Sequence, residues 1–225
     1  MNNIKWDFSG KVVLVVGDTR GIGKSVVEKF SLAGADVFGI NSSNCDISNK
    51  KDIDVYFEDL ESIDILINVA AVNYAKKIQN ISFEEWDEVL NTNLRSYFYI
   101  TKKVLEIMSD GGKIVNVSSI AGRHRSLTSG SHYTASKAGI IGLTKQIAYE
   151  VSNRNINVNC VCPSQTDTDM LKESMTKEKL EYLESTIPLG RIAKVEEQVY
   201  PIMFLCSDEA SYITGTTLDI NGGQL

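Results

Sequence analysis

Short apolar runs rich in Val and Ile alternate along the chain with longer stretches whose apolar residues recur at helical spacing. Near-continuous apolar strands separated by helices predict a parallel sheet covered on both faces. No linker rich in Pro, Gly or Ser and no repeat divides this pattern, so it predicts one doubly wound α/β domain over 1–225. Strands are predicted at 11–17, 36–40, 63–70, 113–119, 156–163 and 217–220, and helices at 21–35, 49–61, 83–108, 132–152 and 195–206.

Composition and charge narrow the classes of function. The 225 residues carry 23 Lys and Arg against 29 Asp and Glu, a net charge of −6, which argues against a nucleic-acid partner. No run of about 18 apolar residues predicts a membrane span, and the N-terminal segment lacks the apolar core of a signal peptide. The 4 Cys have no metal-ligand spacing and are predicted to be reduced thiols of a cytoplasmic protein.

A glycine-rich segment, VGDTRGIG at 16–23, joins the first predicted strand to its helix. Gly17 permits a tight turn, and Gly21 and Gly23 let the backbone approach a pyrophosphate at the positive end of the helix. The G-x-x-x-G-x-G spacing differs from G-x-G-x-x-G, and glycine-rich turns occur in many loops. Alone, the segment is only a modest indicator of a dinucleotide site.

A tyrosine and a lysine in YTASK carry the more specific chemistry. Tyr133 and Lys137 stand one helical turn apart on the same face. A phenol titrates near pH 10, and a neighbouring ammonium that stabilises the phenolate lowers the phenol pKa and makes it usable as an acid or base. A single Y-x-x-x-K is most often a surface pair on an amphipathic helix, so the surrounding motifs must decide.

The order of those motifs resembles the short-chain dehydrogenase/reductase family. The similarity covers about residues 8–223 and implies a Rossmann-like fold that transfers a hydride between a nicotinamide and a carbonyl or alcohol carbon. The motifs, in order, are VGDTRGIG (16–23), NVAA (68–71), NTNL around Asn93, NVSSIAG (116–122), YTASK, CPSQTDTDM (162–170), PLGRIAKVEE (188–197), FLCSDEASYITG (204–215) and DINGG (219–223).

The resemblance implies four catalytic residues. Ser119 would donate a hydrogen bond to the substrate carbonyl, and Tyr133 would transfer the proton. Lys137 would hold the nicotinamide ribose and lower the Tyr133 pKa, while Asn93 would anchor a water that completes a proton relay. Ser118 competes for the serine role, but Ser119 aligns with the family's S-x-x-G step, and strand alternation places only one of the two on the active-site face.

The end of the second strand bears on the choice of cofactor. Family members that prefer NAD carry an acid there, which binds the ribose hydroxyls, and this chain has Asn41. Arg20 matches a basic position that meets the 2′-phosphate in NADP-preferring relatives, and Ser42 and Ser43 follow Asn41, so NADP(H) is favoured and NAD(H) stays possible. The expected cofactor contacts are Gly17, Thr19, Arg20, Gly21, Ile22, Gly23, Asn41, Ser42, Asp46, Asn68, Ala70, Tyr133, Lys137, Pro163, Thr166 and Thr168.

The segment after Ile40 is unusually short. Asp46 resembles the family's residue that meets the adenine, yet only 41–44 separate Ile40 from Cys45. A parallel crossover needs about a dozen residues. We therefore expect a sheet that lacks the usual third, edge strand and the helix before it, with a thinner wall around the adenine. Ser48 is expected to cap the helix that follows.

Two segments are expected to border the substrate. Residues 122–133 are polar and basic, and 164–190 correspond to the family's variable lid, which is expected to move. No metal site is expected, since no carboxylate or thiol spacing accompanies the two histidines. The expected substrate contacts are Arg125, His132 and Gln165, with Met170, Leu171 and Met175 as further lid contacts.

Two classes of substrate are consistent with the sequence. Arg154 matches a basic position that some 3-oxoacyl-(acyl-carrier-protein) reductases use to meet their acidic carrier, but Asp110 replaces a second basic residue. A sugar or nucleotide-sugar ketone is therefore slightly favoured over an acyl thioester. A non-catalytic dinucleotide sensor is the alternative from another class. The resemblance also implies a homo-oligomer, a tetramer or a dimer, through the helices at 83–108 and 132–152 and the C-terminal strand.

Overall fold

Six parallel strands form one sheet in the computed structural model, which describes residues 5–126, 128–168, 171 and 176–224. The strand order is β2-β1-β3-β4-β5-β6, and every neighbouring pair is parallel. The strands are β1 (Val12–Val16), β2 (Asp36–Ile40), β3 (Ile63–Asn68), β4 (Met108–Val117), β5 (Asn157–Pro163) and β6 (Thr217–Ile220). The α/β class with a parallel sheet is thus confirmed.

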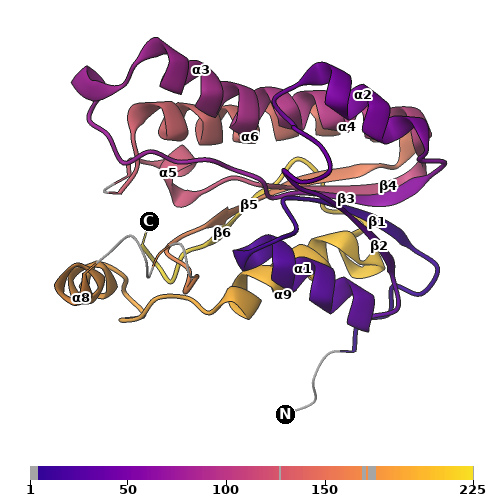
Figure 1. Cartoon of the computed structure of the whole chain (residues 1–225). Coiled ribbons are helices and arrows are strands. Elements are labelled where there is room, and N and C mark those ends of the chain that lie inside the picture. The colour runs from indigo at the N-terminus through magenta and orange to yellow at the C-terminus, as the bar shows by residue number, and fades with distance from the viewer. Residues whose placement is uncertain (1–4, 127, 169–170, 172–175, 225) are drawn as a thin grey trace.

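Helices cover both faces of this sheet (Figure 1). One face carries α2 (Lys50–Glu58), α3 (Phe83–Leu90), α4 (Ser96–Ile107), α5 (Ile120–Arg123) and α6 (Ser131–Glu150), and the other carries α1 (Gly21–Leu32), α8 (Lys177–Ser185) and α9 (Val195–Cys206). Short turns of 3-10 helix are η1 (Ile78–Asn80), η3 (Ser152–Arg154) and η4 (Asp208–Ala210). None of the described helices is both long and apolar enough to cross a membrane.

The alternation of side chains along β1 divides the core into two layers. Leu14 and Val16 pack into the layer beneath α4 and α6, while Val13 and Val15 pack into the layer against α1 and α9. All four side chains are buried. A strand that is apolar at every position is what a sheet covered on both faces requires, because neither set of side chains meets water.

The shortened connection after β2 leaves that strand at the edge of the sheet. In the described chain no strand lies beyond β2, which confirms the expected loss of the third strand and its helix. The outward carbonyl of Gly39 accepts hydrogen bonds from the Tyr56 hydroxyl at 3.1 Å and the Asn44 amide at 2.9 Å. Side chains therefore occupy an edge acceptor that would otherwise be open to another strand.

Two local expectations were wrong. The helix predicted at 83–108 is interrupted by a π-helical segment, η2 (Asn91–Arg95), and β4 begins at Met108 rather than at 113. Ser48 does not cap α2; its N–H and hydroxyl both donate to Asp46, and Asn49 caps the helix by accepting from the Lys51 N–H. The side-chain oxygen of Asp46 competes for Ser48, which moves the cap one residue on.

Candidate active site

The predicted catalytic serine follows the carboxyl end of β4, and the tyrosine and lysine lie in the first two turns of α6. In doubly wound α/β folds, ligands bind at the carboxyl ends of the strands. Helix α5 packs against α6 and β5, so the short helix that starts after Ser119 holds that residue close to the tyrosine–lysine pair.

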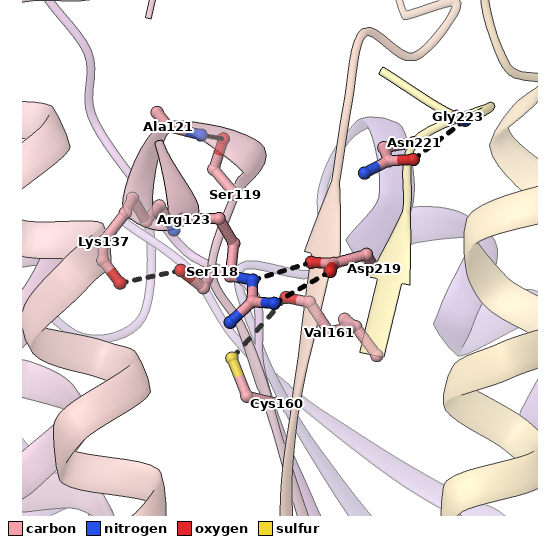
Figure 2. Close-up of polar contacts among 10 residues, drawn as sticks. All are labelled: Ser118, Ser119, Ala121, Arg123, Lys137, Cys160, Val161, Asp219, Asn221 and Gly223. Atoms are coloured by element: carbon pink, nitrogen blue, oxygen red, sulfur yellow. Dashed lines mark hydrogen bonds and ion pairs between the residues drawn. The ribbon is translucent and has the colours of Figure 1, made fainter. Parts of the chain in front are cut away.

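Ser118 and Ser119 have different environments (Figure 2). The Ser118 hydroxyl is buried and donates to the Lys137 backbone carbonyl at 2.7 Å, which fixes β4 to α6. The Ser119 hydroxyl accepts from the Ala121 N–H at 3.1 Å and lies close enough to the Tyr133 phenol to lower its pKa. Of the two, only the Ser119 hydroxyl affects the pKa of the phenol.

Tyr133 is only partly exposed, and burial raises the pKa of its phenol above the ordinary value, while the nearby Ser119 hydroxyl opposes that shift. The sequence predicted a lowered Tyr133 pKa because of Lys137. The Lys137 Nζ lies 5.6 Å from the centre of the Tyr133 ring, over its face, and burial outweighs its effect in this structure.

Lys137 is one of the largest fully buried side chains of the molecule. Its Nζ donates to the Val117 carbonyl at 2.8 Å, and no carboxylate pairs with it in the described part of the chain. Burial lowers the pKa of the Lys137 ammonium from 10.5 to about 8. A buried ammonium without a carboxylate partner lowers the stability of the folded protein, so we expect Lys137 to be kept for function.

Asn93 lies within the π-helical segment and is buried. Its Oδ1 accepts from the Val72 N–H and its Nδ2 donates to the Val72 carbonyl, each at 2.8 Å. The same Nδ2 lies 3.2 Å from the Ser136 hydroxyl on α6. Single π-helical turns are frequent at functional sites, and this one directs an amide between two segments of the site.

Tyr97 was not predicted from the sequence. It is fully buried, and its hydroxyl lies 3.1 Å from the Ala70 carbonyl and 3.3 Å from the Val117 carbonyl. The Lys137 Nζ donates to that same Val117 carbonyl and lies 5.6 Å from the centre of the Tyr97 ring. The available signal was spacing, because Tyr97 lies four residues after Asn93 in a helical pattern.

The glycine-rich segment has the geometry of an anion-binding helix start. Gly17 has a φ of 94°, and a Cβ there would lie 2.7 Å from the Ala70 backbone. At Gly23 a Cβ would lie 1.8 Å from the Gly17 carbonyl oxygen, so neither position admits a side chain. Arg20 stands at the N-cap of α1 without a side-chain cap, and the first turn holds no acid. The exposed N–H groups and the helix dipole therefore suit a pyrophosphate.

The other predicted cofactor residues divide into structural and accessible groups. The Asn68 Nδ2 donates to Asn116 at 2.9 Å, and its Oδ1 is buried without a partner among the described residues. The Thr166 hydroxyl donates to the Ser164 carbonyl. A Cβ built on Gly21 would lie 3.2 Å from the Thr168 methyl, so the segment after β5 lies against the glycine-rich segment. Ile22 packs into the core, Pro163 ends β5, and Thr19, Ser42 and Asp46 are exposed.

The expected substrate residues lie in different settings. His132 is buried, and its Nδ1 accepts from the Tyr133 N–H, which leaves the Nε2 without a described partner. Burial lowers the pKa of the His132 imidazole. The Gln165 Oε1 is likewise buried without a described partner, whereas Arg125 is exposed. Met170 and Met175, with part of the expected lid, lie outside the described residues.

One basic residue of the substrate-side loop is neutralised. The Arg123 guanidinium donates to both carboxylate oxygens of Asp219 on β6, each at 3.1 Å (Figure 2). The pair fastens α5 to the last strand, next to the turn after Ser119. The loop is therefore less basic than its sequence indicates. Among the described residues, no group of three His, Cys, Asp or Glu side chains is arranged to hold a metal.

These features have counterparts in known proteins. The model of the enoyl-(acyl carrier protein) reductase group matches residues 38–224. The chain belongs to the short-chain dehydrogenase/reductase family and is an oxidoreductase of that NAD(P)-dependent class. Its Rossmann-like sheet, with helices on both faces, agrees with that membership.

Particular relatives are similar over nearly the whole chain. The 3-oxoacyl-[acyl-carrier-protein] reductase FabG of Aquifex aeolicus is 36% identical over 96% of this chain and 97% of its own length. That of Haemophilus influenzae is 34% identical over 95% and 98%. The ligand-free structure of Thermoplasma acidophilum aldohexose dehydrogenase has a TM-score of 0.89 at 31% identity, covering 96% of this chain and 94% of that one.

Proposed function

We propose that this protein interconverts a carbonyl and a secondary alcohol by hydride transfer with a nicotinamide dinucleotide. The single observation that carries the proposal is the cluster at the end of β4. There the Ser119 hydroxyl lies close enough to the Tyr133 phenol to lower its pKa, and the Lys137 ammonium lies over the face of the same ring. A phenol between a hydroxyl donor and a buried cation is suited to proton transfer.

The residues of this chain would bind, orient and protonate. The glycine loop and the start of α1 would hold the pyrophosphate, and Lys137 would hold the nicotinamide ribose. The dinucleotide, when bound, supplies or accepts the hydride. Ser119 would donate to the substrate oxygen, and Tyr133 would pass its proton to the alkoxide that develops there, or take it back in oxidation. Asn93 would connect Lys137 to solvent through a water.

The substrate we favour is a small polar carbonyl compound such as a sugar or nucleotide-sugar ketone. Arg154 supports this choice, because its guanidinium donates to Asp110 at 2.9 Å and to the Leu105 carbonyl at 2.9 Å, and also to the Met108 carbonyl. A guanidinium bound to a carboxylate and two carbonyls is a poor dock for an acidic carrier. The similarity to an aldohexose dehydrogenase points the same way.

Reduction of 3-oxoacyl-(acyl-carrier-protein) thioesters is the second candidate. It is favoured by the names of the relatives at 34 and 36% identity, which are 3-oxoacyl-[acyl-carrier-protein] reductases. The two candidates share the chemistry of Ser119 and Tyr133 and differ only in what binds beside it.

Steady-state assays with both dinucleotides separate these candidates. We expect kcat/KM for aldoses, or for keto-sugars in the reducing direction, to exceed that for 3-oxoacyl thioesters by at least about tenfold. Rapid turnover of acyl thioesters alone would reject the sugar proposal. Binding of a dinucleotide with no turnover across the whole panel would favour a non-catalytic sensor.

We also propose a homo-oligomer, a tetramer or a dimer, that pairs the α4–α6 face with a second copy. An open groove of about 520 Å³ lies between α6 and the helical stretch from the end of α3 to the start of α4, and the half-exposed Phe98 lines it. A Cβ at Gly142, on the groove, would meet nothing within 4 Å. We expect Phe98→Glu to shift the mass measured by analytical ultracentrifugation toward a smaller species. A wild-type monomer at micromolar concentration would contradict the proposal.

Membership of the family does not determine whether the protein prefers NADP(H) or NAD(H). From the sequence, NADP(H) is favoured because Asn41 replaces an acid and Arg20 is basic. That preference stays a prediction, and the environment of Asn41 bears on it directly.

A further inference from the structure

The carboxylate of Asp18 reaches the carboxyl end of β2 from the glycine loop. Its Oδ1 accepts from the Asn41 Nδ2 at 3.0 Å. Its Oδ2 lies so close to Gly39 that a Cβ built on that residue would be 1.8 Å from it. Glycine inside a strand weakens the strand and often marks a place where another group approaches closely. Here the approaching group is a carboxylate from a segment more than twenty residues earlier.

Three of the four polar residues after β2, namely Asn41, Ser43 and Asn44, hold this arrangement through hydrogen bonds. The Asn41 Oδ1 accepts from the Ser43 N–H at 2.9 Å and the Ser43 hydroxyl at 2.5 Å. The Asn41 N–H donates to the Asn44 Oδ1 at 2.9 Å. Asn41 therefore presents its amide to Asp18 and its oxygen to Ser43. Neither Asn41 nor Ser43 is free to receive a phosphate without breaking these bonds.

In dinucleotide-binding α/β folds, an acid at the end of the second strand binds the ribose hydroxyls next to the adenine and repels a 2′-phosphate. We infer that Asp18 takes this role here and makes the protein select NAD(H) over NADP(H). The inference rests on the proposed function, since it assumes that a dinucleotide binds along the glycine loop. It replaces the reading of Asn41 as a position that admits a 2′-phosphate.

Arg20 is the competing charge. It is exposed, forms no ion pair in the described part of the chain, and stands two residues from Asp18. Asp18 is partly buried and fixed by Asn41, whereas a free arginine side chain must lose rotamer entropy to bind. The fixed Asp18 carboxylate at the strand end has no such entropic cost. We therefore expect Asp18, rather than Arg20, to determine which cofactor binds more tightly.

Binding titrations test the inference without any substrate. Quenching of intrinsic fluorescence should show wild-type protein binding NADH at least about tenfold more tightly than NADPH. Asp18→Asn keeps the shape and removes the charge; it should tighten NADPH and weaken NADH, moving the ratio of the two dissociation constants by about tenfold or more. Gly39→Ala, which crowds the carboxylate out of its position, should move the ratio in the same direction.

Asp36→Asn is the matched control, because Asp36 is the exposed acid at the opposite end of the same strand. It should change neither constant by more than about twofold. Wild-type preference for NADPH, or an unchanged ratio in folded Asp18→Asn protein, would overturn the inference and leave the proposed function standing. Failure of the wild type to bind either dinucleotide would instead reject the proposed function.

Discussion

Replacing Tyr133 by Phe should lower kcat/KM by about a thousandfold, while the dissociation constant of the preferred dinucleotide changes by no more than about twofold. Phe keeps the aromatic ring over which the Lys137 ammonium lies and removes only the proton that the reaction moves. The Ser119 hydroxyl keeps its bond from the Ala121 N–H, so removal of the phenol leaves no buried group without a partner. Steady-state kinetics and a fluorescence titration measure the two quantities.

Tyr97→Phe is the matched control for that experiment. Tyr97 is a second buried phenol beside the same lysine, but its hydroxyl is directed at the carbonyls of Ala70 and Val117 rather than at Ser119. We expect it to lower the free energy of unfolding by about 1 kcal/mol and to retain most of the activity. If Tyr133→Phe kept a tenth of wild-type turnover, or Tyr97→Phe lost as much as Tyr133→Phe, the assignment of the proton donor would be wrong.

The sequence predicted those features that covalent geometry or local pattern determines. A connection of four residues after Ile40 is too short for a parallel crossover whatever the side chains are, so the edge position of β2 followed directly. Strand limits were close where apolar runs end at turns, as at β2 and β6. The π-helical segment was not predicted, because one extra residue per turn does not disturb the helical spacing of apolar residues over so short a stretch.

Contacts between distant residues could not be predicted in the same way. Arg123 and Asp219 pair across 96 positions, and each looks like an ordinary surface charge in its own segment. Asp18 and Asn41 are 23 positions apart, and only the fold brings the loop carboxylate to the strand end. The catalytic candidates came from a family pattern, whereas the positions of Tyr97 beside Lys137 and of Asp18 at the end of β2 follow from packing. Residues that act through packing are visible only after the chain is folded.

Lys137→Met should inactivate the enzyme and make it more stable. Lowering the Lys137 pKa from 10.5 to about 8 by burial costs about 3 kcal/mol at neutral pH. Met fills a similar volume without a charge. The Val117 carbonyl loses the Lys137 ammonium as a donor but still has the Tyr97 hydroxyl at 3.3 Å. We expect the free energy of unfolding at pH 7 to rise by about 1–3 kcal/mol and kcat/KM to fall by at least about a hundredfold.

The pH dependence of the stability gain shows whether it comes from removal of the buried charge or from a change in packing. Because the folded-state pKa of Lys137 lies below the unfolded value, the unfolded wild type binds more protons between pH 8 and 10.5, and the wild-type stability contribution of this group rises with pH over that window. The variant lacks this rise. Its advantage in urea unfolding should therefore be largest below pH 8 and shrink toward pH 10.5.

Lys113→Met provides the comparison that isolates function. Lys113 lies on β4, four residues before Val117. It is also buried, and burial also lowers its pKa, but its ammonium donates to the Asn157 side-chain oxygen at 2.5 Å. This variant should keep its activity, since it leaves the Tyr133 site untouched. A Lys137→Met protein less stable than wild type at pH 7, or an advantage that does not change with pH, would show that the ammonium is not the source of strain. A Lys137→Met protein that is more stable at pH 7, with an advantage that shrinks as pH rises, would show that the buried cation beside the proton donor lowers the stability of the wild type.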